Sequence, residues 1–165
     1  MTDLSLQQIL ELIHGTQSSY YKLTLITGGA MAGKTRILKL VSDQLALPLI
    51  NLNLLLSQRL LSLNNRQRSL HAEAVALDIL DEHASTGLCI DNTELLFDST
   101  LRLNPLVFLQ EISRNRLVVA TWNGVFANGE LRYAHNGHPD AFCQLVTGHP
   151  VISVAENKLH LHLTS

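Results

Sequence analysis

The segment GGAMAGKT, residues 28–35, fits the phosphate-binding pattern G-x-x-x-x-G-K-[ST] at each of its fixed positions. In such a segment the glycines let backbone N–H groups surround a phosphate, the lysine neutralises phosphate oxygens, and the hydroxyl binds Mg²⁺. From average residue usage, a chance match in a chain of this length is roughly a 1% event. The pattern therefore predicts a nucleotide site. The residues expected to hold the nucleotide are Gly28, Gly29, Ala30, Met31, Ala32, Gly33, Lys34, Thr35 and Arg36.

A second acidic position follows the apolar run LCI at residues 88–90, where Asp91 ends a predicted strand. A phosphate site of this kind needs a carboxylate at the end of another strand, because the carboxylate holds Mg²⁺ through water. We therefore expect Thr35 and Asp91 to bind the ion. The alternative is that Asp91 caps a helix beginning in DNTELL, and both roles are compatible with the sequence.

Three further polar residues are candidates to act on the nucleotide. Many additional-strand P-loop ATPases place a glutamate directly after this aspartate, as the base that polarises the attacking water; here that position is Asn92. Glu94 is the candidate base, and a capping-box or surface carboxylate is its alternative role. Thr121 and Asn123, at the end of LVVATWN, are candidates for contacting the γ-phosphate, against a plain turn before Gly124.

Several arginines lie near predicted element ends. Arg114 and Arg116, just ahead of LVVATWN, could stabilise phosphate charge across a subunit boundary. The alternative is that they only favour the end of a helix through its dipole. Arg59, Arg66 and Arg68 surround a break between two helical stretches and could contact phosphate, protein or nothing, with a solvated face as the default.

Eight histidines raise the question of a metal site. His160 and His162 alternate on one strand face, and His138 and His149 both belong to Gly-His-Pro. No acid or cysteine partners with ligand-like spacing surround them, so structural or surface roles are favoured.

Composition sets the broad class. The 165 residues predict one domain, 46% are hydrophobic, and no apolar run approaches the length of a membrane span. The N-terminus lacks the basic region of a signal peptide. Cys89 and Cys143 lack CxxC spacing and are expected to be buried, reduced thiols of a cytoplasmic protein. The net charge of −2 argues against a general nucleic-acid coat without excluding a local basic patch.

The elements that must position these residues alternate between strands and helices. Strands are predicted at 22–27, 49–53, 87–91, 117–122, 151–154 and 158–163, and helices within 1–20 and at 34–45, 54–63, 67–83 and 101–113. The alternation predicts an α/β fold with a mainly parallel sheet. With the phosphate segment it indicates a three-layer P-loop NTPase-like domain of the additional-strand ATPase type, spanning 1–165 without a lid domain. In 124–165, Asn128-Gly129 and Asn136-Gly137 predict turns among loops and short strands.

With these residues placed, the chain resembles the small P-loop protein of type 3 BREX phage-defence systems, the BrxF-like family. The matching segments are GGAMAGKT, LNLLLSQRLLSL, IDNTELLFD, SRNRLVVATWNG and LRYAHNGHPDAF. The resemblance implies an ATP-binding component of a bacterial complex that restricts phage together with a DNA methyltransferase and other large subunits. It assigns Tyr133, His138 and Pro139 to a family-specific loop. Asn92 departs from many ATPases and puts strong hydrolysis in doubt.

Three functions follow from these patterns. The leading one is an ATPase or ATP-dependent assembly subunit that uses ATP and Mg²⁺ and acts as a homo-oligomer or with a larger partner, with any DNA contact weak or indirect. The second is a small-molecule phosphotransferase, which usually needs a basic lid; Arg132 is the only basic Lys or Arg side chain between Gly124 and His149. The third is a nucleotide-binding scaffold without turnover, which the missing adjacent glutamate favours.

Overall fold

The fold is built on a six-stranded sheet, seen in a computed structural model that describes residues 4–83, 86–134, 137–156 and 158–164. The strand order is β2-β3-β4-β1-β8-β9. Five strands run parallel and β9 is antiparallel to β8. The bounds are β1 Leu23–Gly28, β2 Leu49–Asn51, β3 Gly87–Asp91, β4 Leu117–Asn123, β8 Val151–Ala155 and β9 Lys158–His162. The predicted α/β class with a mainly parallel sheet is confirmed.

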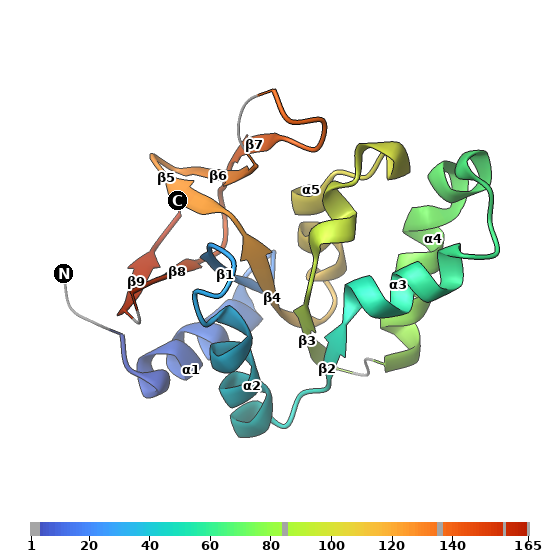
Figure 1. Ribbon diagram of the computed structural model, residues 1–165. Helices are drawn as coiled ribbons and strands as arrows, with labels where there is room; N and C mark the ends of the chain where they lie inside the picture. The colour runs from blue at the N-terminus through green and yellow to red at the C-terminus, as the bar shows by residue number, and fades with distance from the viewer. Residues whose placement is uncertain (1–3, 84–85, 135–136, 157, 165) are drawn as a thin grey trace.

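Helices cover both faces of this sheet (Figure 1). Successive strand side chains point to opposite faces, so Leu88 and Ile90 join one apolar cluster while Cys89 joins the other. The Cys89 side is covered by α1 (Leu6–Gly15) and α2 (Lys34–Leu45). The other side is covered by α3 (Leu52–Leu60), α4 (Asn65–His83) and α5 (Pro105–Ile112).

The carboxyl ends of β1, β3 and β4 lie at the same edge of the sheet, because the three strands are parallel and adjacent. β4 lies between β1 and β3. The segments that follow these strands therefore meet at one edge, which is where ligands bind in open α/β sheets. We call this edge the carboxyl edge and the opposite one the amino edge.

Helix caps shift several predicted boundaries. β2 ends at Asn51, because the Asn51 side chain accepts a hydrogen bond from the backbone N–H of Leu54 and so caps α3. Asn53, predicted to lie in the strand, is therefore in the first turn of a helix. The helix predicted from residue 101 begins only at Pro105, where Asn104 caps it. The 3₁₀ helices η2 (Glu94–Phe97) and η3 (Ser99–Leu101) precede it.

Residues after β4 form a separate antiparallel sheet of three strands. Its strands are β5 Val125–Ala127, β6 Glu130–Tyr133 and β7 Phe142–Leu145. Asn128 and Gly129 have φ angles of 54° and 78°, so the turn predicted there joins β5 to β6. An aromatic cluster attaches the sheet to the core: the Tyr133 ring stacks on Phe97 at 3.9 Å, and Phe97 meets Trp122 edge-on at 4.6 Å. Asn136, of the second predicted turn, is outside the described residues.

The two cysteines differ in environment, and one prediction is wrong. Cys89 is buried on β3, and burial raises the pKa of its thiol to about 12. Cys143 is exposed, because β7 belongs to the three-stranded sheet rather than to the main core. In the described part of the chain, no helix is both long and apolar enough to cross a membrane.

Candidate functional site

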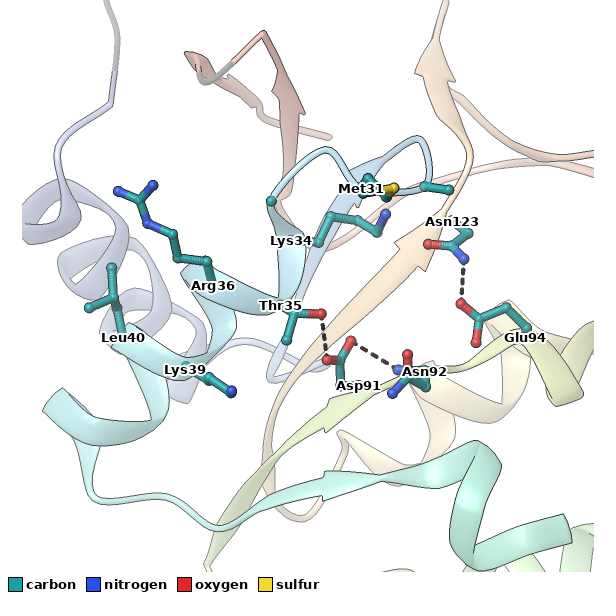
Figure 2. A pocket seen from close by; sticks show the side chains of 12 residues that line it. Met31, Lys34, Thr35, Arg36, Lys39, Leu40, Asp91, Asn92, Glu94 and Asn123 are labelled. Atoms are coloured by element: carbon teal, nitrogen blue, oxygen red, sulfur yellow. Dashed lines mark hydrogen bonds between the residues drawn. The ribbon is translucent and has the colours of Figure 1, made fainter.

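A cavity of about 710 Å³ opens at the carboxyl edge, beside the loop between β1 and α2 (Figure 2). Side chains from α2, from the end of β3, from η2 and from the end of β4 face it. Its lining residues are Ala30, Met31, Gly33, Lys34, Thr35, Arg36, Lys39, Leu40, Asp91, Asn92, Glu94 and Asn123. The structure thus brings together most of the residues that the sequence predicts for nucleotide binding.

Glycine is required at two positions of the loop. A β-carbon on Gly28 would lie 2.7 Å from the carbonyl oxygen of Val154, so the end of β1 can approach β8 only without a side chain. Gly33 has a φ of 101° where it caps α2. Between them Met31, at the tip of the loop, is fully exposed with a φ of 61°. The loop therefore wraps back on itself and directs the start of α2 at the cavity.

Lys34 lies deep in the site and is only 7% exposed. Its ammonium donates hydrogen bonds to the carbonyl oxygens of Gly28, at 3.0 Å, and Gly29, at 2.6 Å. Burial lowers the pKa of Lys34, while the negative charges of Glu94 and Asp91 oppose this shift. The ammonium is thus held by the loop itself, within reach of anything that the loop binds.

The Asp91 carboxylate accepts three hydrogen bonds at the end of β3. One carboxylate oxygen accepts a hydrogen bond from the Thr35 hydroxyl at 2.7 Å. The other accepts from the Thr121 hydroxyl at 2.7 Å and from the Asn92 backbone N–H at 2.9 Å. η2 begins after Thr93, so the alternative role of Asp91 as its cap is wrong. Thr35 and Asp91 lie together, as the sequence predicts.

The two candidates at the end of β4 have different roles. Asn123 lines the cavity, whereas Thr121 is 3% exposed and its hydroxyl donates a hydrogen bond to the Asp91 carboxylate. The register explains this difference, because Ile90 pairs with Ala120 and the next residues, Asp91 and Thr121, follow side by side. Of the two candidates for contacting the γ-phosphate, Asn123 therefore faces the cavity, whereas the Thr121 hydroxyl is bonded to Asp91.

Glu94 is held between two side-chain amides. Its carboxylate accepts hydrogen bonds from the Asn123 amide and, at 2.7 Å, from the Asn53 amide. Figure 2 shows the Asn123 contact at the side of the cavity opposite α2. Thr93 precedes η2 without a side-chain cap, so Glu94 belongs to no capping box. Beyond β3 the chain turns at Asn92, which has a φ of 53°, and Glu94 follows this turn.

Asn53 is a site residue that sequence reasoning missed. Besides donating to Glu94, its side-chain oxygen accepts from the Leu95 backbone N–H at 2.8 Å, and its own backbone N–H donates to the Asn92 carbonyl at 2.9 Å. Three contacts from one residue thus tie α3 to the segment that carries Glu94. The sequence offered one signal for this role: Asn53 is a second asparagine, two positions after Asn51, which caps α3.

Arg114 and Arg116 lie at the amino edge, away from this cavity. Arg116 pairs with Asp81 at 2.8 Å, and Arg114 pairs with Glu111 at 3.2 Å and lies 4.8 Å from the centre of the Tyr20 ring. The seven residues of β4 span roughly 20 Å between these arginines and the cavity. They take no part in the site of their own chain, and action on a neighbouring subunit stays a prediction.

His162 and His149 have partners of other kinds than a metal. His162 bonds the Ser153 hydroxyl at 2.9 Å and its ring lies 4.7 Å from Phe126. His149 is 3% exposed and its Nε2 accepts from the Gln110 amide at 3.2 Å. Across the described ranges, no three His, Cys, Asp or Glu side chains are grouped so that they could hold a metal.

No model of a known protein family matches the chain, and no curated protein matches it. Lys34, Thr35, Asp91, Glu94 and Asn123 all face the one cavity at the carboxyl edge.

Proposed function

We propose that the chain binds ATP with Mg²⁺ in the cavity at the carboxyl edge and hydrolyses it. The observation that carries this proposal is the position of the Glu94 carboxylate. It faces the same cavity as the Lys34 ammonium and is held by two amides, those of Asn53 and Asn123. A carboxylate fixed beside a phosphate-binding loop, here the segment GGAMAGKT that we call the cradle, is suited to accept a proton from an attacking water.

Binding of the nucleotide is assigned to the loop and the start of α2. Backbone N–H groups of the loop and the helix N-terminus favour phosphate oxygens, and Lys34 adds a full positive charge. Arg36 and Lys39 also line the cavity and are exposed. The cavity volume of about 710 Å³ is within the range of small-molecule sites.

The residues present fit Mg²⁺. This ion takes hard oxygen ligands and is usually bound by one or two protein groups together with water and substrate phosphates. The Thr35 hydroxyl and the Asp91 carboxylate, 2.7 Å apart, supply such oxygens beside the cradle. When bound, Mg²⁺ neutralises charge on the transferred phosphoryl group. Thr121 fixes the Asp91 carboxylate from the buried side.

The strand order supports the ATPase over the phosphotransferase. β4 lies between the strand of the cradle and the strand of Asp91, which is the order expected for additional-strand P-loop ATPases. A phosphotransferase usually needs a basic lid, but Arg132 is bound to Glu130 on β6. The hypothesis of a nucleotide-binding scaffold without turnover depends on Asn92, which stands where many ATPases have the catalytic glutamate. Glu94, two residues further on, lines the cavity and supports turnover instead.

The biological setting is proposed from the sequence resemblance. GGAMAGKT, IDNTELLFD and SRNRLVVATWNG resemble the BrxF-like proteins of type 3 BREX systems, so the chain is assigned to a complex that restricts phage. In the described part of the chain, β4 is followed by the small three-stranded sheet β5-β6-β7 and not by a helical lid domain. We therefore propose that the chain acts through self-association or through a larger subunit.

Phosphate release and nucleotide binding by the purified protein test this function. We expect Lys34→Ala to weaken binding of a fluorescent ATP analogue at least ~100-fold, and Glu94→Gln to slow phosphate release at least ~100-fold while binding is kept. Glu73→Gln is the matched control, because Glu73 is exposed on α4. If wild-type protein binds ATP but releases no phosphate, with DNA or partner subunits present, hydrolysis is excluded and the scaffold remains. Light scattering with and without ATP–Mg²⁺ measures self-association.

A further inference from the structure

A smaller cavity, of about 180 Å³, adjoins the nucleotide cavity at the start of α2. The two cavities share Gly33 and Arg36 as lining residues. We call the smaller one the α2–β8 cavity. Its other lining residues are Ala32, Ile37, Val154 and Leu159. A ligand held by the start of α2 therefore lies at the boundary between the two cavities.

The α2–β8 cavity differs from the nucleotide cavity in its chemistry. Apart from Arg36, the side chains that line it are apolar, and all of these belong to the apolar cluster on the Cys89 side of the sheet or pack against it. Val154 and Leu159 are cross-strand partners on β8 and β9, so their side chains lie on the same face. No Asp, Glu, Asn or Gln is among its described lining residues. The cavity therefore suits an uncharged, largely apolar group.

Arg36 lies where the two cavities meet. Figure 2 shows its side chain on α2, directed away from Asp91 and Glu94. Arg36 is exposed, and among the residues that the structure describes its guanidinium has no ion-pair or hydrogen-bond partner. A guanidinium plane stacks well on the face of an aromatic ring. Arg36 is thus available to cover a ring that enters the α2–β8 cavity.

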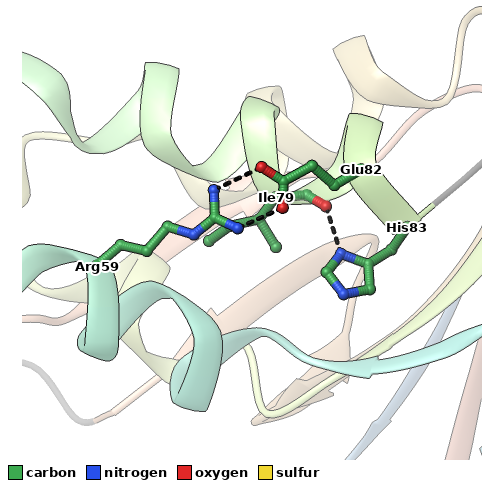
Figure 3. Close-up of polar contacts among 4 residues, drawn as sticks. All are labelled: Arg59, Ile79, Glu82 and His83. Atoms are coloured by element: carbon green, nitrogen blue, oxygen red, sulfur yellow. Dashed lines mark hydrogen bonds and ion pairs between the residues drawn. The ribbon is translucent and has the colours of Figure 1, made fainter.

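The three arginines around the break between α3 and α4 lie away from this boundary. Arg59 forms a two-pronged ion pair with Glu82 that joins α3 to α4 (Figure 3). Arg68 donates to two backbone carbonyl oxygens near the end of α3, both at 2.9 Å. Arg66 is exposed. None of the three lines either cavity, and Arg36 is the only arginine among the described lining residues of both.

A nucleoside triphosphate has the two chemistries that the adjoining cavities offer. Its phosphates suit Lys34 and the N-terminus of α2 in the nucleotide cavity. Its base is a planar, uncharged ring system, and burying the ring faces in an apolar cavity is favourable. An inorganic polyphosphate would use only the nucleotide cavity. The apolar lining of the second cavity therefore favours a ligand that carries a ring as well as phosphates.

The lining of the α2–β8 cavity also discriminates between purines. Guanine carries a ring N–H and an amino group on the edge where adenine has a ring nitrogen acceptor and a C–H. Buried donors cost free energy unless they find an acceptor. A carboxylate side chain that could accept from both guanine donors is absent from the described lining residues. The cavity therefore favours adenine.

We propose that the α2–β8 cavity holds the adenine ring of ATP, with Val154 and Leu159 in contact with the ring and Arg36 stacked on its open face. This assignment rests on the proposed binding of a nucleotide at the carboxyl edge, but not on hydrolysis. It gives selection of the base to the start of α2 and to the strands β8 and β9.

Isothermal titration calorimetry of the full chain with Mg²⁺ and, in separate titrations, ATP, GTP and tripolyphosphate tests the proposal. We expect ATP to bind at least ~10-fold more tightly than tripolyphosphate, because the base is buried as well, and at least ~10-fold more tightly than GTP. Leu159→Gln should weaken ATP binding at least ~10-fold and change tripolyphosphate binding less than ~2-fold. Arg36→Ala, at an exposed position, should weaken ATP binding about 5-fold and likewise leave tripolyphosphate binding in place.

The matched control is Leu161→Gln. Leu161 is another half-buried leucine on the same face of β9 and packs against the same apolar cluster, but it does not line the cavity. We expect it to change both affinities less than ~2-fold, and circular dichroism melting verifies that the variants fold.

Three results would overturn the adenine site while leaving nucleotide binding at the loop intact. They are equal affinity of the wild-type chain for ATP and tripolyphosphate, equal affinity for ATP and GTP, and equal loss of ATP affinity in the two leucine variants. A parallel loss of ATP and tripolyphosphate binding in Arg36→Ala would place Arg36 on phosphate instead of on the ring. If the wild-type chain binds none of the three ligands, the proposed function itself fails, and the adenine site with it.

Discussion

The two edges of the parallel sheet use polar side chains in different ways. At the carboxyl edge Lys34, Asp91 and Glu94 face one cavity. Lys34 donates a hydrogen bond to a carbonyl oxygen of the loop, Asp91 accepts one from Thr35, and Glu94 accepts one from Asn53. At the amino edge Arg114 and Arg116 pair with acids beside them and face no common cavity with each other in the described structure. Charged side chains therefore line a common cavity at the carboxyl edge, whereas at the amino edge they form separate ion pairs.

Burial explains the difference. Lys34 and Asp91 are each 7% exposed, and a buried charge is costly unless it is paired or used. In the Arg114–Glu111 pair the side chains are 44% and 54% exposed, and such pairs contribute about 0–1 kcal/mol. A chain that keeps several charges buried around a cavity accepts a cost in stability, and a ligand with opposite charge offsets it. An exposed ion pair such as Arg114–Glu111 needs no such explanation.

Exchanging one aspartate at each edge gives the largest expected contrast. Asp91→Asn removes the negative charge beside Thr35 and should slow phosphate release at least ~1,000-fold, about 4 kcal/mol, because the ligand for Mg²⁺ is weakened. Asp81→Asn removes only the exposed partner of Arg116 and should leave phosphate release unchanged. Equal losses in the two variants would show that the edges do not differ in the proposed way.

The buried histidine of the amino edge gives a pH-dependent test. Burial lowers the pKa of His149 to about 4, from an ordinary value near 6.5. The neutral ring is therefore favoured by folding. Its contribution is fully present above about pH 6.5 and is lost as the pH falls towards 4, so the free energy of unfolding should fall by up to about 3 kcal/mol. Denaturant titrations at several pH values measure this change.

His149→Gln should remove most of that pH dependence, whereas His14→Gln, at an exposed position of α1, should leave it in place. If the pH dependence is the same in both variants, other groups cause it, and the amino edge holds no costly buried titratable group at this position.

Asn51 and Asn53, two residues apart at the start of α3, allow a finer comparison between a helix cap and a residue that contacts Glu94. Asn53→Ala should lower kcat about 10-fold with little change in KM, because Glu94 loses one of its two amide donors while the nucleotide contacts remain. Asn51→Ala should instead cost about 1 kcal/mol of unfolding free energy through loss of the α3 cap and leave kcat unchanged. A rise in KM without a change in kcat for Asn53→Ala would contradict its role in positioning Glu94.

The parallel sheet and the phosphate loop were predictable, because each has a local signal in the chain. Apolar runs mark β1, β3 and β4, and Gly33 of GGAMAGKT is needed by the loop itself, because it has a φ of 101° where it caps α2. The end of β3 was also predictable, since Asp91 directly follows an apolar run. These features depend on neighbours in sequence.

The other site features depend on pairing between distant segments. Thr121 and Asn123 have the same strand periodicity, and only the register with β3 decides which of them meets Asp91. Asn53 was missed because the boundary between β2 and α3 was placed two residues late, and that boundary is set by the Asn51 cap. Cys143 was expected in the core, but the turn at Asn128-Gly129 builds a separate sheet.

The smallest expected effect is at Arg116. Its ion pair with Asp81 is 22% and 62% exposed, so Arg116→Ala should lower the unfolding free energy by less than about 1 kcal/mol and leave phosphate release unchanged. The alternative prediction is that this arginine stabilises phosphate charge on a neighbouring subunit. In that case release by Arg116→Ala would fall at least ~10-fold. Adding Lys34→Ala chains, which keep Arg116 but lack the loop lysine, would then restore activity, because their Arg116 completes the site of the Arg116→Ala chain, which has kept its own Lys34. Restoration in the mixture would join the amino edge of one chain to the carboxyl edge of the next, and the two edges would form one site.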